Sequence, residues 1–237
     1  MSLIIDLNVN LMHIDERAKD KEPASKAEKY FVIILSLAFL FMMSMEILSN
    51  YEPKKLGALL FVVFWIPLLF IHEFGHAIMA KMLGWRIDRT VIGFGRILAQ
   101  TRLLGAPMEI RTIPLEGFVQ IAPKTTHLAR YKHALIYFAG PGIELLLFFL
   151  IFIYLGGAEG FFSISNDYMR IALQSFAFAA LAGAVINLIP IGIITKDGST
   201  PNDGMGILLC LFSTGMDYEL WIRESEEERK KDNSAPF

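Results

Sequence analysis

The chain has 237 residues, of which 54% are hydrophobic and only 19% are charged, and its mean hydropathy is +0.47. Soluble globular domains carry about a quarter charged residues, so this composition excludes an ordinary soluble protein. The net charge of −2 gives no electrostatic basis for a nucleic-acid partner, and the single cysteine, Cys210, excludes an internal disulfide and a cysteine-built metal site. We expect a mainly α-helical, multi-pass membrane protein.

Apolar runs of about 20 residues have the length that crosses a bilayer core, and they predict about four transmembrane helices. These spans cover about residues 30–49, 56–80, 133–155 and 171–189. A shorter apolar run, Met205–Phe212, predicts a re-entrant or interfacial helix. The polar, charged residues 1–29 contain no apolar core, so we expect no signal peptide.

Most of the 22 lysine and arginine residues fall in segments that the predicted spans place on one side of the membrane. The positive-inside rule therefore predicts cytoplasmic termini, with a tail at 1–29, a membrane domain at 30–217 and a second tail at 218–237. The plasma membrane of a prokaryote is the expected location. The second tail is rich in charge and predicts a solvated, disordered segment.

Residues 84–123 are rich in Gly, Pro, Thr and β-branched residues, which predicts a small membrane-associated β region of short strands. Ile5–Leu11 alternates apolar and polar residues, the period of a half-buried strand. Both segments fall on the predicted cytoplasmic side, and a lone strand is unstable in water. We hypothesise that they form one sheet, with a disordered N-terminal tail as the alternative.

His72-Glu73-Phe74-Gly75-His76 carries the chemistry. A helix places both histidines on one face, which suits two ligands of a tetrahedral zinc ion. Glu73 is placed to act as general base on a water activated by that metal. The motif follows the uncharged run Leu56–Ile71, so it lies inside the second predicted span, where ionisable groups are costly and usually functional.

Together with three further segments, this motif resembles the site-2 protease family of intramembrane zinc metalloproteases. Asn187–Pro190, followed by an Asp-Gly pair, resembles the family's Asn-x-x-Pro signature. Pro114–Val119 resembles its Pro-Leu-Gly-Gly-Tyr/Phe-Val strand, and Gly140-Pro141 resembles its Gly-Pro-x-x-Asn. The four matches fall in the family's order across about Leu56–Leu211.

The resemblance implies a zinc metalloendopeptidase with one zinc per chain, which hydrolyses peptide bonds within or next to a transmembrane segment. His72 and His76 would be metal ligands, Glu73 the catalytic residue, and the partner a membrane protein or membrane-bound peptide in the lipid bilayer. Asn187 would hydrogen-bond the substrate or the oxyanion, with an interhelical hydrogen bond as the alternative. The substrate must unwind, and an edge of the 84–123 strands offers it β-augmentation. Homo-oligomerisation stays open.

The third ligand has two candidates, because Asp197-Gly198 and Asp203-Gly204 both follow Pro190. The short spacing from Asn187 favours Asp197, although Asp197 precedes a turn-like Gly-Ser-Thr-Pro sequence. The apolar helical run after Gly204 favours Asp203, which we take as the ligand.

Some residues depart from the family pattern or stand outside it. Glu116 replaces the first glycine of the strand motif and Glu144 replaces the asparagine after Gly140-Pro141. Glu144 is either a solvated residue at the start of its span or a polar partner of the active site. Three further histidines are expected at the surface: His13, His127 and His133.

Two other protein classes remain as alternatives. A zinc-binding membrane scaffold or chaperone that lacks proteolysis is one, although binding alone does not require an intact Glu73. A membrane metallopeptidase with a cytoplasmic catalytic domain is the other, and it would need the motif on a soluble amphipathic helix.

Overall fold

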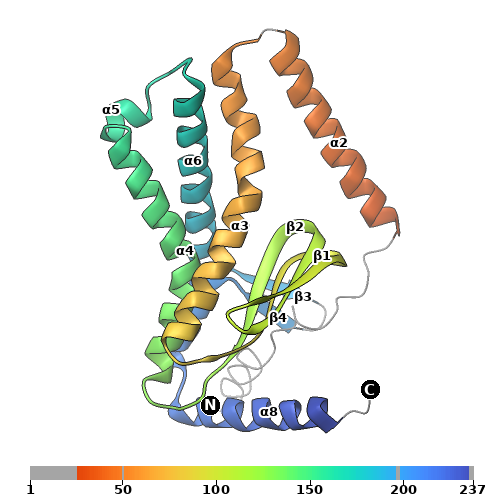
Figure 1. The fold of residues 1–237 in the computed structure, drawn as a ribbon, viewed down its shortest axis with the longest axis vertical. Coiled ribbons are helices and arrows are strands. Elements are labelled where there is room, and N and C mark those ends of the chain that lie inside the picture. Colours follow the sequence, from red (N-terminus) through yellow and green to blue (C-terminus); the bar gives the residue numbers. More distant parts are fainter. Residues whose placement is uncertain (1–25, 50, 196–197, 235–237) are drawn as a thin grey trace. The chain divides into compact units, whose positions relative to one another are not determined.

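The structure is a computed structural model that describes residues 26–49, 51–195 and 198–234 (Figure 1). Helices dominate it, and the expected small β region is present. In chain order, the elements are α2 (Lys26–Ser49), the 3-10 turn η2 (Pro53–Lys55), α3 (Leu56–Met82), β1 (Arg86–Leu103), β2 (Ala106–Ala122), α4 (Ala129–Tyr154), α5 (Gly157–Phe161), α6 (Tyr168–Leu188), β3 (Gly192–Thr195), β4 (Gly198–Pro201), α7 (Asp203–Phe212) and α8 (Gly215–Ser234).

Three helical segments among the described residues are long and apolar enough to cross a membrane: Pro53–Met82, Ala129–Tyr154 and Tyr168–Leu188. They coincide with the second, third and fourth predicted spans. The first predicted span forms α2, and its crossing of a membrane stays a prediction. A further candidate is α7 with Gly215–Glu227, a pair bent by 116° that forms either a broken span or a re-entrant loop. This bend agrees with the expectation that Met205–Phe212 is too short to span.

The predicted β region is one antiparallel hairpin of β1 and β2, with two long strands in place of several short ones (Figure 1). Its turn is at Leu104-Gly105, where both residues have positive φ values of 54° and 92°. Gly93 and Gly95 also have positive φ, and the register shifts around them. These glycines therefore form bulges within one strand, where the sequence suggested turns between strands.

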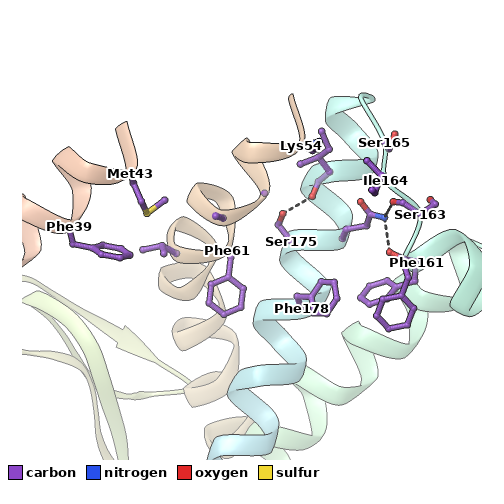
Figure 2. A pocket seen from close by; sticks show the side chains of 16 residues that line it. Phe39, Met43, Lys54, Phe61, Phe161, Ser163, Ile164, Ser165, Ser175 and Phe178 are labelled. Atoms are coloured by element: carbon purple, nitrogen blue, oxygen red, sulfur yellow. Dashed lines mark hydrogen bonds between the residues drawn. The ribbon is translucent and has the colours of Figure 1, made fainter. Parts of the chain in front are cut away.

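The described residues form two compact units. One contains Leu69–Ile143 with residues 184–195 and 198–234, and the other contains residues 26–49 and 51–68 with Glu144–Gly183. The second unit has a core of phenylalanine rings and a cavity of about 770 Å³, lined mainly by apolar side chains of α2, α3, α6 and the loop after α5 (Figure 2). None of the motif residues His72–His76 lines this cavity.

The C-terminal helix and the cluster that packs against it correct two expectations. Residues 215–234 form α8, so the prediction of a disordered tail is wrong for this part. Tyr218 of α8 is 1% exposed and packs with Trp85 in one apolar cluster, to which Trp221 also packs. His133 is 3% exposed beside them, so its expected surface position is wrong too. Ile5–Leu11 lies outside the described residues, and the sheet proposed for it stays a prediction.

Candidate metal centre

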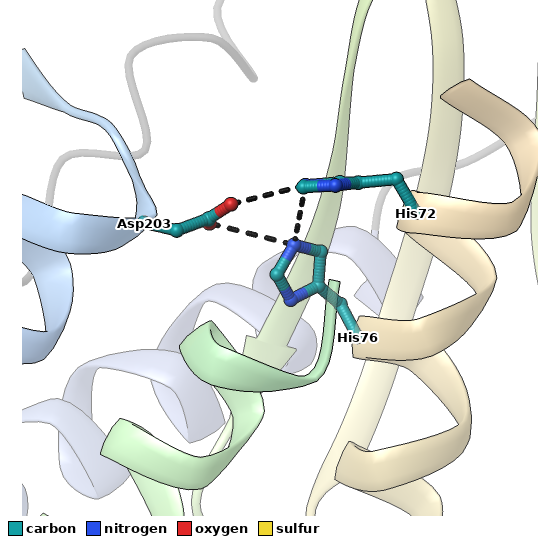
Figure 3. A group of neighbouring side chains, drawn as sticks. All are labelled: His72, His76 and Asp203. Carbon is teal, nitrogen blue, oxygen red and sulfur yellow. Dashed lines mark hydrogen bonds and ion pairs between the residues drawn. The ribbon is translucent and has the colours of Figure 1, made fainter. Parts of the chain in front are cut away.

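His72, His76 and Asp203 converge in one buried group (Figure 3). The two histidines project from successive turns of α3, and Asp203 begins α7 and faces them. His72 Nε2 is 3.0 Å from Asp203 Oδ2, and His76 Nε2 is 3.4 Å from Asp203 Oδ1. The two Nε2 atoms are 3.0 Å apart. One donor atom from each residue thus points at a common centre, as a metal site requires.

The ring of His76 is oriented by α4. Its Nδ1 is 2.6 Å from the backbone carbonyl oxygen of Ile136, and a carbonyl can only accept, so Nδ1 carries the proton. In neutral imidazole the other nitrogen, Nε2, then keeps its lone pair, and it faces the centre. A backbone carbonyl behind a histidine is the usual outer support of a metal ligand.

Gly140 gives the two histidines their space. A Cβ on residue 140 would collide with His76 Nε2 and would lie 2.7 Å from His72 Nε2. On the facing helix, a Cβ on Gly75 would lie 2.7 Å from the carbonyl oxygen of Ala139. Helices α3 and α4 therefore meet through glycines, and the Gly140-Pro141 segment singled out in the sequence forms the wall behind the imidazoles.

Asn202, which sequence reasoning missed, fixes the start of α7. Its Oδ1 accepts from Met205 N at 3.0 Å as the N-cap, and also from Ile191 N at 3.1 Å. Its Nδ2 donates to the carbonyl of Ile189 at 2.6 Å, so the cap joins α7 to the end of α6. An Asn directly before an acidic first turn is a recognisable N-cap signal.

The β3–β4 hairpin explains how Asp203 reaches the site. Gly192 pairs with Pro201, and Asn202 N donates to the carbonyl of Ile191 at 3.1 Å, so the chain returns to the end of α6. Gly204 then packs directly on the carbonyl of Leu188. Asp197 lies outside the described residues.

Glu73 is 4% exposed and lies beneath β2. A Cβ on Gly117 would lie 2.7 Å from Glu73 Cγ and 2.8 Å from Oε1. The strand that was singled out in the sequence therefore runs directly past this carboxylate. Its neighbour Glu116 is exposed, so a glutamate fits there in place of the family's first glycine.

The remaining candidates divide between the two units. Asn187 is half-buried in the last turn of α6, close to Gly204 through its backbone oxygen. Glu144 is 3% exposed in the other unit, so the first of its two alternatives, a solvated residue, is wrong, and its carboxylate packs on Gly183. His127 is exposed as expected.

Residues 59–166 match the model of Peptidase family M50. The match covers just under half of the chain, which is thus similar to peptidase family M50, the site-2 protease family. The predicted resemblance to this family is confirmed, and the M50 match covers the His72–His76 motif, the β hairpin and Gly140-Pro141.

Individual relatives agree with the M50 match. The chain is 30% identical over 120 residues (45% of this chain, 32% of the relative) to a protein of Campylobacter jejuni named as a zinc metalloprotease. It is 32% identical over 105 residues (38% and 26%) to zinc metalloprotease Rip1 of Mycobacterium tuberculosis. To the regulator of sigma-E protease RseP of Escherichia coli it is 42% identical over 62 residues (26% and 14%).

These matches span about a third or less of the length of the curated relatives. The names of two of these relatives include zinc, and His72, His76 and Asp203 form a group that could hold a metal ion, which agrees with the expectation of zinc as the cofactor.

Proposed function

We propose that this protein is an intramembrane zinc metalloendopeptidase, which hydrolyses a peptide bond within or next to a transmembrane segment of a membrane protein or membrane-bound peptide. One observation carries this function: His72 and His76 converge with Asp203, and both histidines and Glu73 lie on a helix that is long and apolar enough to cross a membrane. A soluble metallopeptidase would have no reason to bury these groups in such a helix.

His72, His76 and Asp203 are the proposed zinc ligands. Two neutral imidazole nitrogens and one carboxylate oxygen suit a catalytic zinc site, which keeps a fourth position open. Gly140 leaves the space beside the two Nε2 atoms clear of a side chain. Zinc, when bound there, acts as a Lewis acid that activates water for attack on a peptide carbonyl.

Glu73 is the proposed general base. It is not one of the three converging donors, so its carboxylate is available to accept a proton from the attacking water and return one to the leaving amide nitrogen. Its burial against Gly117 fixes the carboxylate in place. A zinc-binding scaffold would need no such group, which favours the protease.

The proximity of β2 to Glu73 suggests how the substrate binds. An extended segment that pairs with the hairpin edge near Gly117 would bring its backbone carbonyls next to Glu73. This pairing would also satisfy amides that an unwound helix exposes in a membrane. Asn187 is proposed to hydrogen-bond the substrate or the oxyanion, with an interhelical bond as its competitor.

The proposed setting is the plasma membrane of a prokaryote. Four spans at about 30–49, 56–80, 133–155 and 171–189 would place both termini in the cytoplasm, as the lysine and arginine distribution favours. The protease domain would cover 30–217, between the tails at 1–29 and 218–237.

Removal of zinc tests this function directly. In liposomes that contain the protein and a library of tagged single-span membrane segments, a zinc chelator should abolish cleavage. Added zinc should restore it, whereas Mg²⁺ should not, because Mg²⁺ prefers an octahedral oxygen site. The measurement is the mass of the released fragments. Cleavage that continues after zinc has been stripped would exclude a zinc protease.

The third ligand is tested by two matched substitutions. Asp203→Asn should weaken zinc binding by at least about tenfold, because an amide oxygen replaces a charged donor. Asp197→Asn should leave affinity unchanged. Competition with a chelator of known affinity measures both values. The reverse order would show that Asp197, favoured by spacing from Asn187, is the ligand.

A further inference from the structure

The ring of Tyr137 limits how closely α7 approaches α4. A Cβ on Gly206 would lie 2.6 Å from both Cε1 and Cζ of this ring, so only a glycine fits at position 206 against the Tyr137 ring. Asp203 is three residues before Gly206, and residues at this spacing share a helix face. The contact at Gly206 therefore sets the position of the first turn of α7, the turn that carries Asp203.

The Tyr137 ring is held from the side of α4 and α8. His133 lies one turn earlier on α4, and its ring centroid is 4.6 Å from that of Tyr137. His133 Nδ1 is 3.3 Å from the hydroxyl of Tyr218 in α8, and the Trp221 ring is 5.2 Å away. His133 and Tyr218 are 3% and 1% exposed, so this stack is closely packed.

The same turn of α4 also supports the other ligand helix. Ile136, next to Tyr137, accepts the Nδ1 proton of His76 through its carbonyl. One turn of α4 thus contacts α3 through Ile136 and α7 through Tyr137. Such a turn is suited to fix the distance between two histidines on one helix and a carboxylate on another.

We propose that Tyr137 is a positioning residue for the third zinc ligand: its ring, backed by His133 and by Tyr218 and Trp221 of α8, sets where α7 presents Asp203. This role rests on the proposed function, since it takes Asp203 as a ligand. It also makes the C-terminal helix α8 part of the support of the metal centre.

A pair of substitutions separates positioning from general stabilisation. Gly206→Ala places a methyl group in the ring of Tyr137 and should weaken zinc binding by about tenfold or more. Tyr137→Leu removes the outer ring atoms and should weaken binding less. Combining the two should recover much of the affinity lost in Gly206→Ala, because the methyl group then fills the vacated space. Additive losses in the double variant would overturn the positioning role.

Two controls accompany this cycle. Gly215→Ala makes the same change where a Cβ would meet nothing within 4 Å, so zinc affinity should be unchanged. Tyr137→Phe keeps the ring and should keep the affinity, and loss in this variant would move the role from the ring to the hydroxyl. The visible absorption of the Co²⁺-substituted protein reports ligand geometry, and it should change in Gly206→Ala and return in the double variant.

The contribution of α8 is tested on its two faces. Trp221→Ala, which opens the stack behind His133, should weaken zinc binding, whereas Leu220→Ala, at a residue that is 37% exposed, should not. Equal zinc affinity in the two variants would show that α8 does not help to position the metal centre.

The experiments distinguish failure of the ligand assignment of Asp203 from failure of the positioning role of Tyr137. An unchanged affinity in Asp203→Asn overturns the ligand assignment itself. A weakened Asp203→Asn together with an unaffected Gly206→Ala overturns only the role of Tyr137.

Discussion

Glu73→Gln is expected to bind zinc as tightly as the wild type and to lose peptide cleavage by about 10²–10⁴-fold, the usual contribution of a general base. Glutamine has nearly the same volume as glutamate, so it fits in the space beside Gly117 that the side chain of Glu73 occupies. Zinc is held by other residues in the proposed site, so the metal should stay. The amide cannot accept the proton of the attacking water, and this single deficit should stop the reaction.

The measurement pairs zinc content with fragment release from single-span membrane segments in liposomes. Glu159→Gln is the matched control, because Glu159 is an exposed glutamate of α5 and has no part in the proposed site. It should cleave as the wild type does. If Glu73→Gln cleaves as fast as the wild type, the protease assignment fails, and a zinc-binding scaffold becomes the better reading of the same geometry.

The part of the site that lies on one helix was predictable from sequence. The spacing of His72 and His76 alone places both on one face of a helix, and the uncharged run before them predicts burial in a span. Helix α3 has this form. The local β pattern of 84–123 was predictable for the same reason, although the bulges at Gly93 and Gly95 were not distinguishable from turns.

Contacts between distant segments were harder to predict. Counting residues from Asn187 pointed to Asp197, because linear spacing cannot reveal that the β3–β4 hairpin returns the chain to α6. The apolar run after Gly204 correctly marked the helix that Asp203 begins, and the choice of Asp203 over Asp197 as the zinc ligand stays a prediction. The functions of Gly140 and Gly117 became visible only as contacts with His76 and Glu73.

The errors at the C-terminus have a related cause. The sequence of α8 is dominated by the charges of its exposed face, so it read as a solvated tail. Its apolar contacts come from few residues, chiefly Tyr218 and Trp221, and their partners Trp85 and His133 lie far away in the chain. Tertiary packing of this kind leaves almost no local pattern, and for the same reason His133 was expected at the surface.

Replacing both His72 and His76 by alanine should abolish zinc binding. Loss of an outer-shell partner alone costs about 10–100-fold in metal affinity, so loss of two direct donors should cost much more. Only Asp203 would remain of the three converging residues, and one carboxylate does not retain zinc against a chelator. Metal analysis of the purified protein should find near-stoichiometric zinc in the wild type and almost none in the double variant.

Thermal unfolding gives an independent reading of the same variant. A ligand that binds only the folded state stabilises it, so a chelator should lower the unfolding temperature of the wild type and leave that of the double variant unchanged. His127→Ala is the control, since His127 is exposed, and it should behave as the wild type. Unchanged zinc in the double variant would place the metal elsewhere, because the buried triad would then have lost two of its three donors without consequence.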